Sequence, residues 1–112
     1  MKLITAIIRP EQLDEVRNAL ESYGVQGLTV SSAHGYGRQR GHTEVYRGAE
    51  YTVDLHAKVR IEVLAADDQA YDLMDVIVAT SNTGTAGDGK VWLVEVYDAV
   101  RVRTGERGVA AI

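Results

Sequence analysis

The sequence predicts a single α+β domain in which two strand–helix–strand units form one antiparallel sheet. The first observation is that the apolar pattern passes twice from strand-like to helical spacing and back. The second is that no linker, repeat or low-complexity segment divides residues 1–112. The third is the size: 112 residues without cysteine are enough for one modest core that no disulfide supports.

The first unit spans residues 2–34. Residues 2–9 are mostly apolar and predict a buried strand. Pro10 opens a helix, at a position where its missing N–H costs nothing. Spacings of 3, 4 and 3 place four side chains on one helical face: Leu13, Val16, Leu20 and Tyr23. Gly24 ends this helix, and residues 27–34 predict the second strand.

The second unit spans residues 58–103. Residues 58–64 alternate between apolar and charged and predict a strand with one buried face. Asp67 or Asp68 is expected to cap a second helix, whose apolar stripe is Ala70, Leu73, Met74, Ile77 and Val78. A glycine-rich turn at 84–89 leads into a strand at 91–96, and a short strand is expected at 100–103.

Together the units predict the ferredoxin-like split βαβ–βαβ sandwich, a four-stranded antiparallel sheet with both helices on one face. The other sheet face then has no cover from its own chain. It either meets water or packs against copies of the chain, and we favour oligomerisation.

Residues 35–56 join the two units and are too long for an ordinary connection. They hold four glycines, three of the six tyrosines and balanced charges, which is not the composition of a disordered linker. We therefore expect a long loop that recognises a partner or ligand.

Charge and hydropathy exclude several classes of protein. A formal net charge of −4 argues against a nucleic-acid binder. No run of eighteen apolar residues could span a membrane, and the first residues lack the apolar core of a signal peptide. The three histidines lie 8 and 14 residues apart, which matches no metal-ligand spacing. We expect a cytoplasmic protein.

Residues 84–90, Gly-Thr-Ala-Gly-Asp-Gly-Lys, come within one residue of a phosphate-binding P-loop. Val91 stands where the hydroxyl for Mg²⁺ would be, and the segment follows a helix instead of a strand, so a P-loop NTPase is rejected. Successive backbone N–H groups beside Lys90 could still bind an anion. The alternative is an ordinary turn.

Arg101 and Arg103 alternate with valines, so the short strand would project both guanidiniums from one face, where they suit phosphate oxygens. The alternative is a solvated strand face. With the glycine turn, the pair predicts a polyphosphate ligand. No general base stands beside a nucleophile, so the residues predict no reaction.

Three stretches resemble the PII signal proteins of nitrogen regulation, and the resemblance runs from Met1 to Ile112. Residues 35–51, within the 35–56 loop, resemble the T-loop of that family. Residues 82–90 resemble its B-loop, and residues 101–112 its C-terminal loop.

The resemblance implies a homotrimer with nucleotide sites between neighbouring subunits, which ATP and ADP share. The residues implied around the adenosine are Ile7, Gly35, Gly37, Glu62 and Leu64. The implied phosphate ligands are Arg38, the backbone of Gly87, Asp88 and Gly89, the Lys90 side chain and, from the adjacent subunit, Arg101 and Arg103.

The resemblance also implies a site for 2-oxoglutarate, formed by Gln39, Gly41 and Lys58, in which Gln39 contributes to an Mg²⁺ ion bridging ATP and 2-oxoglutarate. From the residues alone, Lys58 could equally be a solvated edge charge. Implied partners are ammonium transporters, which recruit the protein to the inner face of the membrane, and enzymes that control glutamine synthetase. Arg47 would enter the transporter pore.

Tyr51 matches the residue that a nucleotidylyltransferase uridylylates or adenylylates in some lineages; the alternative is an unmodified contact. Ala49 excludes the serine phosphorylation of other lineages. The chain departs from the family pattern at Glu11, Ala57, Thr85 and Ala86, of which Thr85 replaces a basic residue. Two other functions stay open: a slow nucleotide-hydrolysing enzyme and a trimeric adaptor without ligands.

Overall fold

The computed structural model describes residues 1–37, 42–46, 49–53 and 55–112; for 42–46 and 49–53 it describes the backbone only. Four strands form the main sheet: β1 (Lys2–Ile8), β2 (Thr29–Gly35), β5 (His56–Ala65) and β6 (Gly89–Glu95). Their order is β2-β5-β1-β6 and every neighbouring pair is antiparallel. The predicted ferredoxin-like fold is confirmed.

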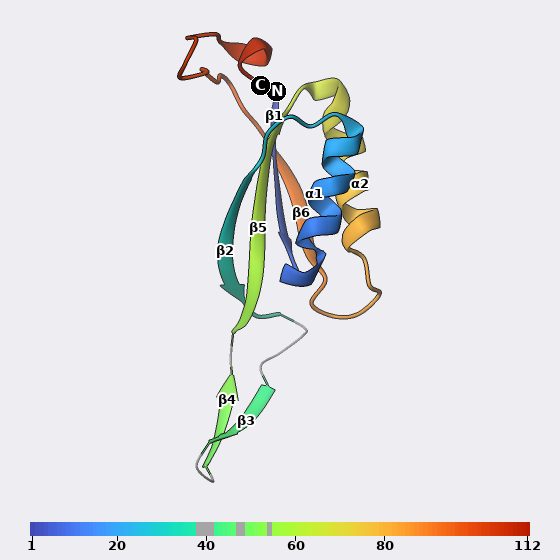
Figure 1. Cartoon of the computed structure of the whole chain (residues 1–112), viewed down its shortest axis with the longest axis vertical. Coiled ribbons are helices and arrows are strands. Elements are labelled where there is room, and N and C mark those ends of the chain that lie inside the picture. The colour runs from blue at the N-terminus through green and yellow to red at the C-terminus, as the bar shows by residue number, and fades with distance from the viewer. Residues whose placement is uncertain (38–41, 47–48, 54) are drawn as a thin grey trace.

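Two helices, α1 (Leu13–Tyr23) and α2 (Asp67–Ser81), lie side by side on one face of this sheet (Figure 1). The core between them is entirely apolar on the strand side, because every second residue of β1 and β5 points toward the helices. Its largest buried side chains are Ile4, Ile8, Val16, Leu20, Ile61, Val63, Leu73 and Ile77. In the described residues, no helix is long and apolar enough to cross a membrane.

The first helix is preceded by a short 3-10 helix, η1 (Pro10–Gln12), so the regular α-helix begins three residues later than Pro10. The predicted end is confirmed, because the amide of Gly24 donates to the carbonyl of Glu21 at 3.0 Å.

The start of the second helix differs from the prediction. Its capping residue is Ala66, which has no side chain that could cap, and Asp67 is the first helical residue. The carboxylate of Asp67 instead accepts a hydrogen bond from the amino terminus of Met1, 2.5 Å away. Capping is therefore replaced by an ion pair at the helix N-terminus, where negative charge is favourable.

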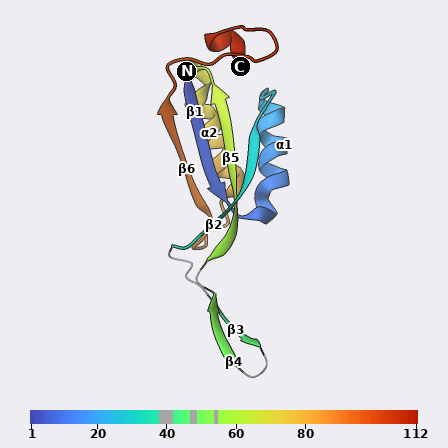
Figure 2. The same cartoon turned by 90° about the vertical axis from the view of Figure 1, so that its left-hand side faces the viewer.

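The long connection between β2 and β5 is not a plain loop. It contains β3 (His42–Tyr46) and β4 (Ala49–Val53), which pair antiparallel in a separate two-stranded sheet. Figures 1 and 2 show this hairpin beyond the end of the four-stranded sheet, away from both termini. The two strands pair only with each other and lie outside the two strand–helix–strand units, so the apolar periodicity that predicted those units did not reveal them.

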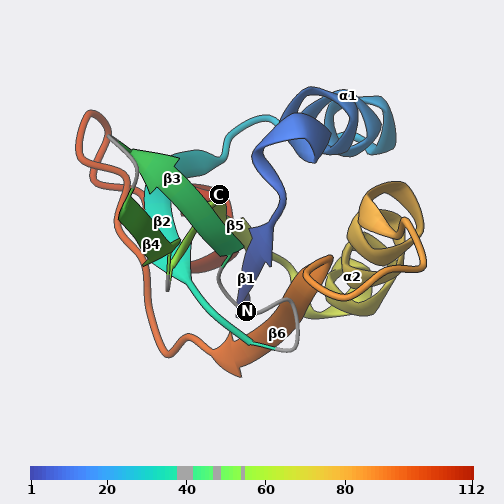
Figure 3. The ribbon, with the colours of Figure 1, turned by 90° about the horizontal axis from the view of Figure 1, so that it is seen from below.

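The expected strand at 100–103 is absent. Val100 makes one isolated bridge with Arg107, and residues 102–104 lie in a turn, followed by a 3-10 helix, η2 (Gly108–Ala111). Alternating Val and Arg fit a strand pattern, but this segment pairs with no strand of the sheet among the described residues. Figures 1 and 2 show the C-terminal segment beyond the end of the sheet where the N-terminus lies, and Figure 3 shows part of it extending to the side away from the two helices.

The sheet face away from the helices carries a mixed row of side chains. From β6 come Trp92 and Val94, which are 40% and 49% exposed, and from β5 comes Leu64 at 36%. Strand register places Trp92 opposite Thr5, and Thr5 opposite Glu62, in one line across the sheet. Large apolar side chains thus stay partly exposed in the single chain, as the sequence predicted for this face.

Candidate functional site

A cavity of about 540 Å³ lies where the end of β1, the end of β2 and the starts of β5 and β6 meet. Its lining brings together segments that are far apart in the sequence: Ile7, Gly35, Tyr36, Gly37, Lys58, Thr85, Ala86, Gly87, Asp88, Gly89, Lys90 and Trp92. Eight of the residues that the sequence selected therefore share one cavity, although they were selected from four separate segments.

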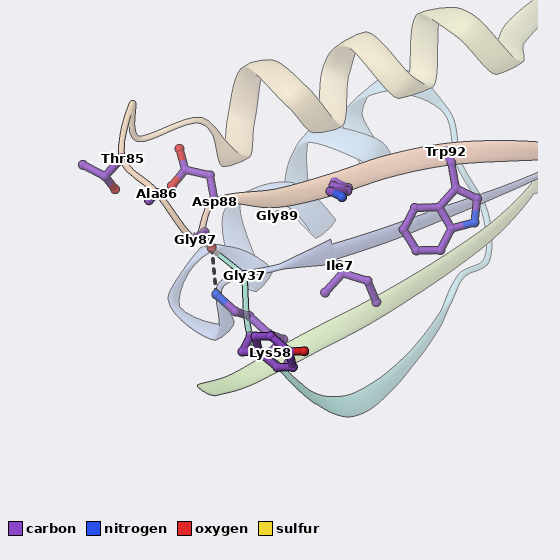
Figure 4. Close-up of a pocket in the computed structure, with 12 residues that line it drawn as sticks. Ile7, Gly37, Lys58, Thr85, Ala86, Gly87, Asp88, Gly89 and Trp92 are labelled. Atoms are coloured by element: carbon purple, nitrogen blue, oxygen red, sulfur yellow. Dashed lines mark hydrogen bonds between the residues drawn. The ribbon is translucent and has the colours of Figure 1, made fainter. Parts of the chain in front are cut away.

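The wall of the cavity is apolar on the β1 and β6 side. Figure 4 shows Ile7 and Trp92 on neighbouring strands, with both side chains pointing away from α2. Sequence reasoning missed Trp92. The available signal was its alternation with Lys90, which puts both side chains on the same strand face. A flat indole beside a branched aliphatic side chain is suited to a planar, weakly polar group.

The glycine turn closes the opposite side of the cavity, and Asp88 holds it together. Its carboxylate accepts hydrogen bonds from the amides of Thr83 and Gly84 at 2.7 and 3.0 Å, and from the Thr83 hydroxyl. Arg9 Nε donates to the same carboxylate at 3.0 Å. These donors favour the charged form and hold the pKa of Asp88 well below its usual range. The Asp88 side chain thus stabilises the turn.

Gly89 allows the turn to enter β6. Its φ is +103°, and a Cβ there would lie 1.7 Å from the carbonyl oxygen of Ile7. Only glycine fits such a close approach of one backbone to another. This glycine therefore fixes how near the turn lies to β1.

Two cations bind the outer carbonyls of the turn. Lys58 Nζ donates to the carbonyl of Gly87 at 2.7 Å (Figure 4), and Arg9 Nη2 donates to the carbonyl of Ala86 at 2.6 Å. Burial of the ammonium group lowers the pKa of Lys58, and the charge of Arg9 lowers it further. Sequence reasoning overlooked Arg9, whose only signal is a single charge at the end of an apolar strand.

Glu62 and Leu64 do not line this cavity of the single chain, so their expected place around the adenosine, in a cleft between subunits, stays a prediction. They line a second cavity of about 640 Å³, with the start of β1, residues 24–29 and the C-terminal Ala111 and Ile112. Register explains the separation. Ile7 lies opposite Arg60, so Glu62 and Leu64 fall two and four residues further along β5.

Arg101 and Arg103 are also remote from the glycine turn of their own chain. Arg101 Nη2 donates to the carbonyl of Ile112 at 2.9 Å, and Nη1 lies 3.4 Å from Glu106. Because the segment is not a strand, the strand geometry from which a shared face of the two guanidiniums was expected is absent. The C-terminal segment lies near the N-terminus, at the other end of the sheet from the turn (Figure 1).

Several expected site residues lie outside the described residues: Arg38, Gln39, Gly41 and Arg47. Tyr51 belongs to β4, of which only the backbone is described. Across the described part of the chain, no three His, Cys, Asp or Glu side chains gather as a protein-built metal site would require.

Comparison with known proteins identifies the family of this chain. The family model described as "Nitrogen regulatory protein P-II" matches residues 1–106. The chain is 50% identical to the nitrogen regulatory protein GlnK of Escherichia coli strain K12 and 52% identical to the nitrogen regulatory protein P-II of Rhizobium meliloti strain 1021. It is 53% identical to the nitrogen regulatory protein P-II of Cereibacter sphaeroides, and each of these alignments covers both chains completely. The chain therefore belongs to the nitrogen regulatory protein P-II family, a family of regulators and not of enzymes.

Proposed function

We propose that the chain senses adenine nucleotides and 2-oxoglutarate and passes that information to nitrogen-assimilation targets. One observation carries the proposal: a single cavity joins an apolar wall of Ile7 and Trp92 to a glycine turn flanked by Lys58 and Lys90. The apolar wall suits a purine base. The turn offers backbone N–H groups, and the two ammonium groups offer positive charge, to the phosphates of ATP or ADP.

The cavity of one chain is open, so we propose that a neighbouring subunit completes it. The partly exposed Leu64 and Val94 would supply apolar contacts of a homotrimer. Glu62, Leu64, Arg101 and Arg103 would then contribute from the adjacent subunit. Their distance from the glycine turn of their own chain supports this assignment.

For 2-oxoglutarate we propose Lys58 as the carboxylate partner, with Gln39 and the Gly41 backbone completing the site. Lys58 already lies at the cavity, where its ammonium group is partly desolvated. Mg²⁺ would be held by phosphate oxygens and Gln39, and it would supply the coordination positions that 2-oxoglutarate fills. With Mg²⁺ held in this way, 2-oxoglutarate binds only after ATP.

Effectors would act by shifting the population of conformations of residues 35–56, since a ligand that binds one conformation better favours it. The hairpin of β3 and β4 would present the docking surface, with Arg47 between the strands in sequence and Tyr51 available to a nucleotidylyltransferase. The proposed targets are an ammonium transporter and enzymes that control glutamine synthetase. The protein would then act in the cytoplasm and reach the membrane only through the transporter.

Isothermal calorimetry of 2-oxoglutarate, first with Mg-ATP and then with Mg-ADP, tests this proposal. We expect 2-oxoglutarate to bind with Mg-ATP alone, and we expect Lys58→Met to abolish that binding even when the variant is saturated with Mg-ATP. The absence of any nucleotide binding at millimolar concentration would contradict the proposal. An intact trimer that still captured a transporter without nucleotide would indicate a ligand-free adaptor.

A further inference from the structure

We propose that Arg9 is a positioning residue that shapes the glycine turn for nucleotide phosphates. This rests on the proposed function, because it concerns the phosphate end of the same cavity. Arg9 follows directly after β1 and stands before Pro10, so the strand and the following helix fix its backbone from both sides. Arg9 does not itself line the cavity.

The guanidinium of Arg9 contacts three residues of the turn. Nε donates to Asp88 at 3.0 Å, and Nη2 donates to the Thr85 hydroxyl at 3.1 Å and to the Ala86 carbonyl at 2.6 Å. The planar fork of arginine can make these contacts from one fixed plane, whereas lysine is a single point of charge. One side chain, only 16% exposed, thus holds the turn from its tip to its last residue.

The contacts have a consequence for anion binding. A turn that binds phosphate must keep its own oxygen atoms away from the ligand, because a carbonyl or carboxylate repels an anion. Arg9 engages the Asp88 carboxylate and the Ala86 carbonyl, and Lys58 engages the Gly87 carbonyl. With these three acceptors engaged by cations, fewer oxygen atoms of the turn would repel an anion that approaches its N–H groups.

Arg9 and Asp88 hold the turn together as one hydrogen-bonded unit. The Asp88 carboxylate binds the amides of Thr83 and Gly84 at the start of the turn, while Arg9 binds the same carboxylate from β1. Removing either the Arg9 guanidinium or the Asp88 carboxylate should loosen the same glycine turn. The two substitutions should therefore be non-additive, which is the property of residues that act as one unit.

The experiment is calorimetric titration of Mg-ATP into the full-length trimer for the wild-type chain, Arg9→Gln, Asp88→Asn and the double variant. We expect about a tenfold loss of affinity in Arg9→Gln, the scale of one charge-assisted hydrogen bond. We expect the double variant to bind within about twofold of Asp88→Asn. Arg17→Gln is the matched control, since it removes the same charge from α1, where Arg17 faces Asp14 at 3.6 Å.

Adenosine, which has no phosphate, separates positioning from general destabilisation. We expect its affinity to change less than about twofold in Arg9→Gln, read from the fluorescence of Trp92. Arg9→Lys retains the charge without the fork and is the second variant to titrate if Arg9→Gln proves too unstable. It should bind Mg-ATP more weakly than wild type. Equal losses for adenosine and ATP, additive losses in the double variant, or wild-type affinity in both Arg9 variants would overturn the inference. A wild-type chain that bound no Mg-ATP would overturn the proposed function as well.

Discussion

Lys58 and Gly87 are joined by a 2.7 Å hydrogen bond from the ammonium group to the backbone carbonyl. Lys58 belongs to β5, just after the connection that contains the hairpin, and Gly87 belongs to the glycine turn before β6. The contact therefore links the connection that would face a partner with the turn that would face phosphate. The ammonium group has three N–H donors, so it can bind a ligand carboxylate while one donor stays on the Gly87 carbonyl, which would place the two ligands side by side at one cation.

Gly89→Ala should destabilise the chain strongly. Its added Cβ would lie 1.7 Å from the Ile7 carbonyl oxygen, so β6 would have to separate from β1. We expect a loss of about 3–5 kcal/mol in the free energy of unfolding, measured by urea denaturation. Gly84→Ala is the matched control, since its φ is also positive at +80° but nothing lies within 4 Å of the new atom. It should cost only about 1–2 kcal/mol, and equal losses in both variants would contradict the contact.

Asp88 should give a defined pH dependence of stability. The pKa of its carboxyl is lowered in the folded state, so its stabilisation is complete above the ordinary value of 3.8 and is lost as pH falls toward the folded value. The difference in unfolding free energy between wild type and Asp88→Asn should be constant from about pH 7 to about pH 5 and shrink below about pH 4. Urea denaturation at a series of pH values measures it. A difference still unchanged at about pH 3 would show that the carboxylate is not held by these donors.

Lys90→Ala should weaken ATP binding by about 1.5–3 kcal/mol, or roughly 10- to 150-fold, because one charge-assisted contact to phosphate is lost. Trp92 provides the readout, since it is the only tryptophan of the chain and lines the cavity at 40% exposure. A bound base should shield the indole from water and shift its emission to shorter wavelength. Trp92→Phe should abolish the signal, and Lys90→Ala within about twofold of wild-type affinity would place the phosphates elsewhere.

Replacing residues 42–53 with a short Gly-Ser linker should leave folding and ATP binding intact. The strands β3 and β4 pair with each other and not with the four-stranded sheet, so the core does not depend on them. We expect an unchanged unfolding midpoint and an unchanged trimer by light scattering, with loss of transporter binding in a pull-down from membranes. Dissociation of the trimer would show that the hairpin is structural.

Much of the fold could be predicted from the sequence, because β1, β5 and both helices each bury one face. The spacing of Leu13, Val16 and Leu20 and the alternation of Val59, Ile61 and Val63 report that burial directly. The sequence predicted a loop in place of the hairpin, whose two strands pair only with each other, and it wrongly predicted a strand in place of the C-terminal turn. Alternating valines at 100 and 102 look like a strand, yet among the described residues this segment has no neighbouring strand with which to form a ladder.

The glycine turn followed from the sequence by itself, since glycines and Lys90 within seven residues are a local property, and its anion-binding character stays a prediction. Only the tertiary structure decided what surrounds the turn. Arg9 and Asp88 are 79 residues apart, and no local pattern shows that their side chains meet. Strand register likewise placed Trp92 in the cavity and Glu62 outside it, because a pairing between distant strands, and not spacing along one strand, decides which side chains share a surface.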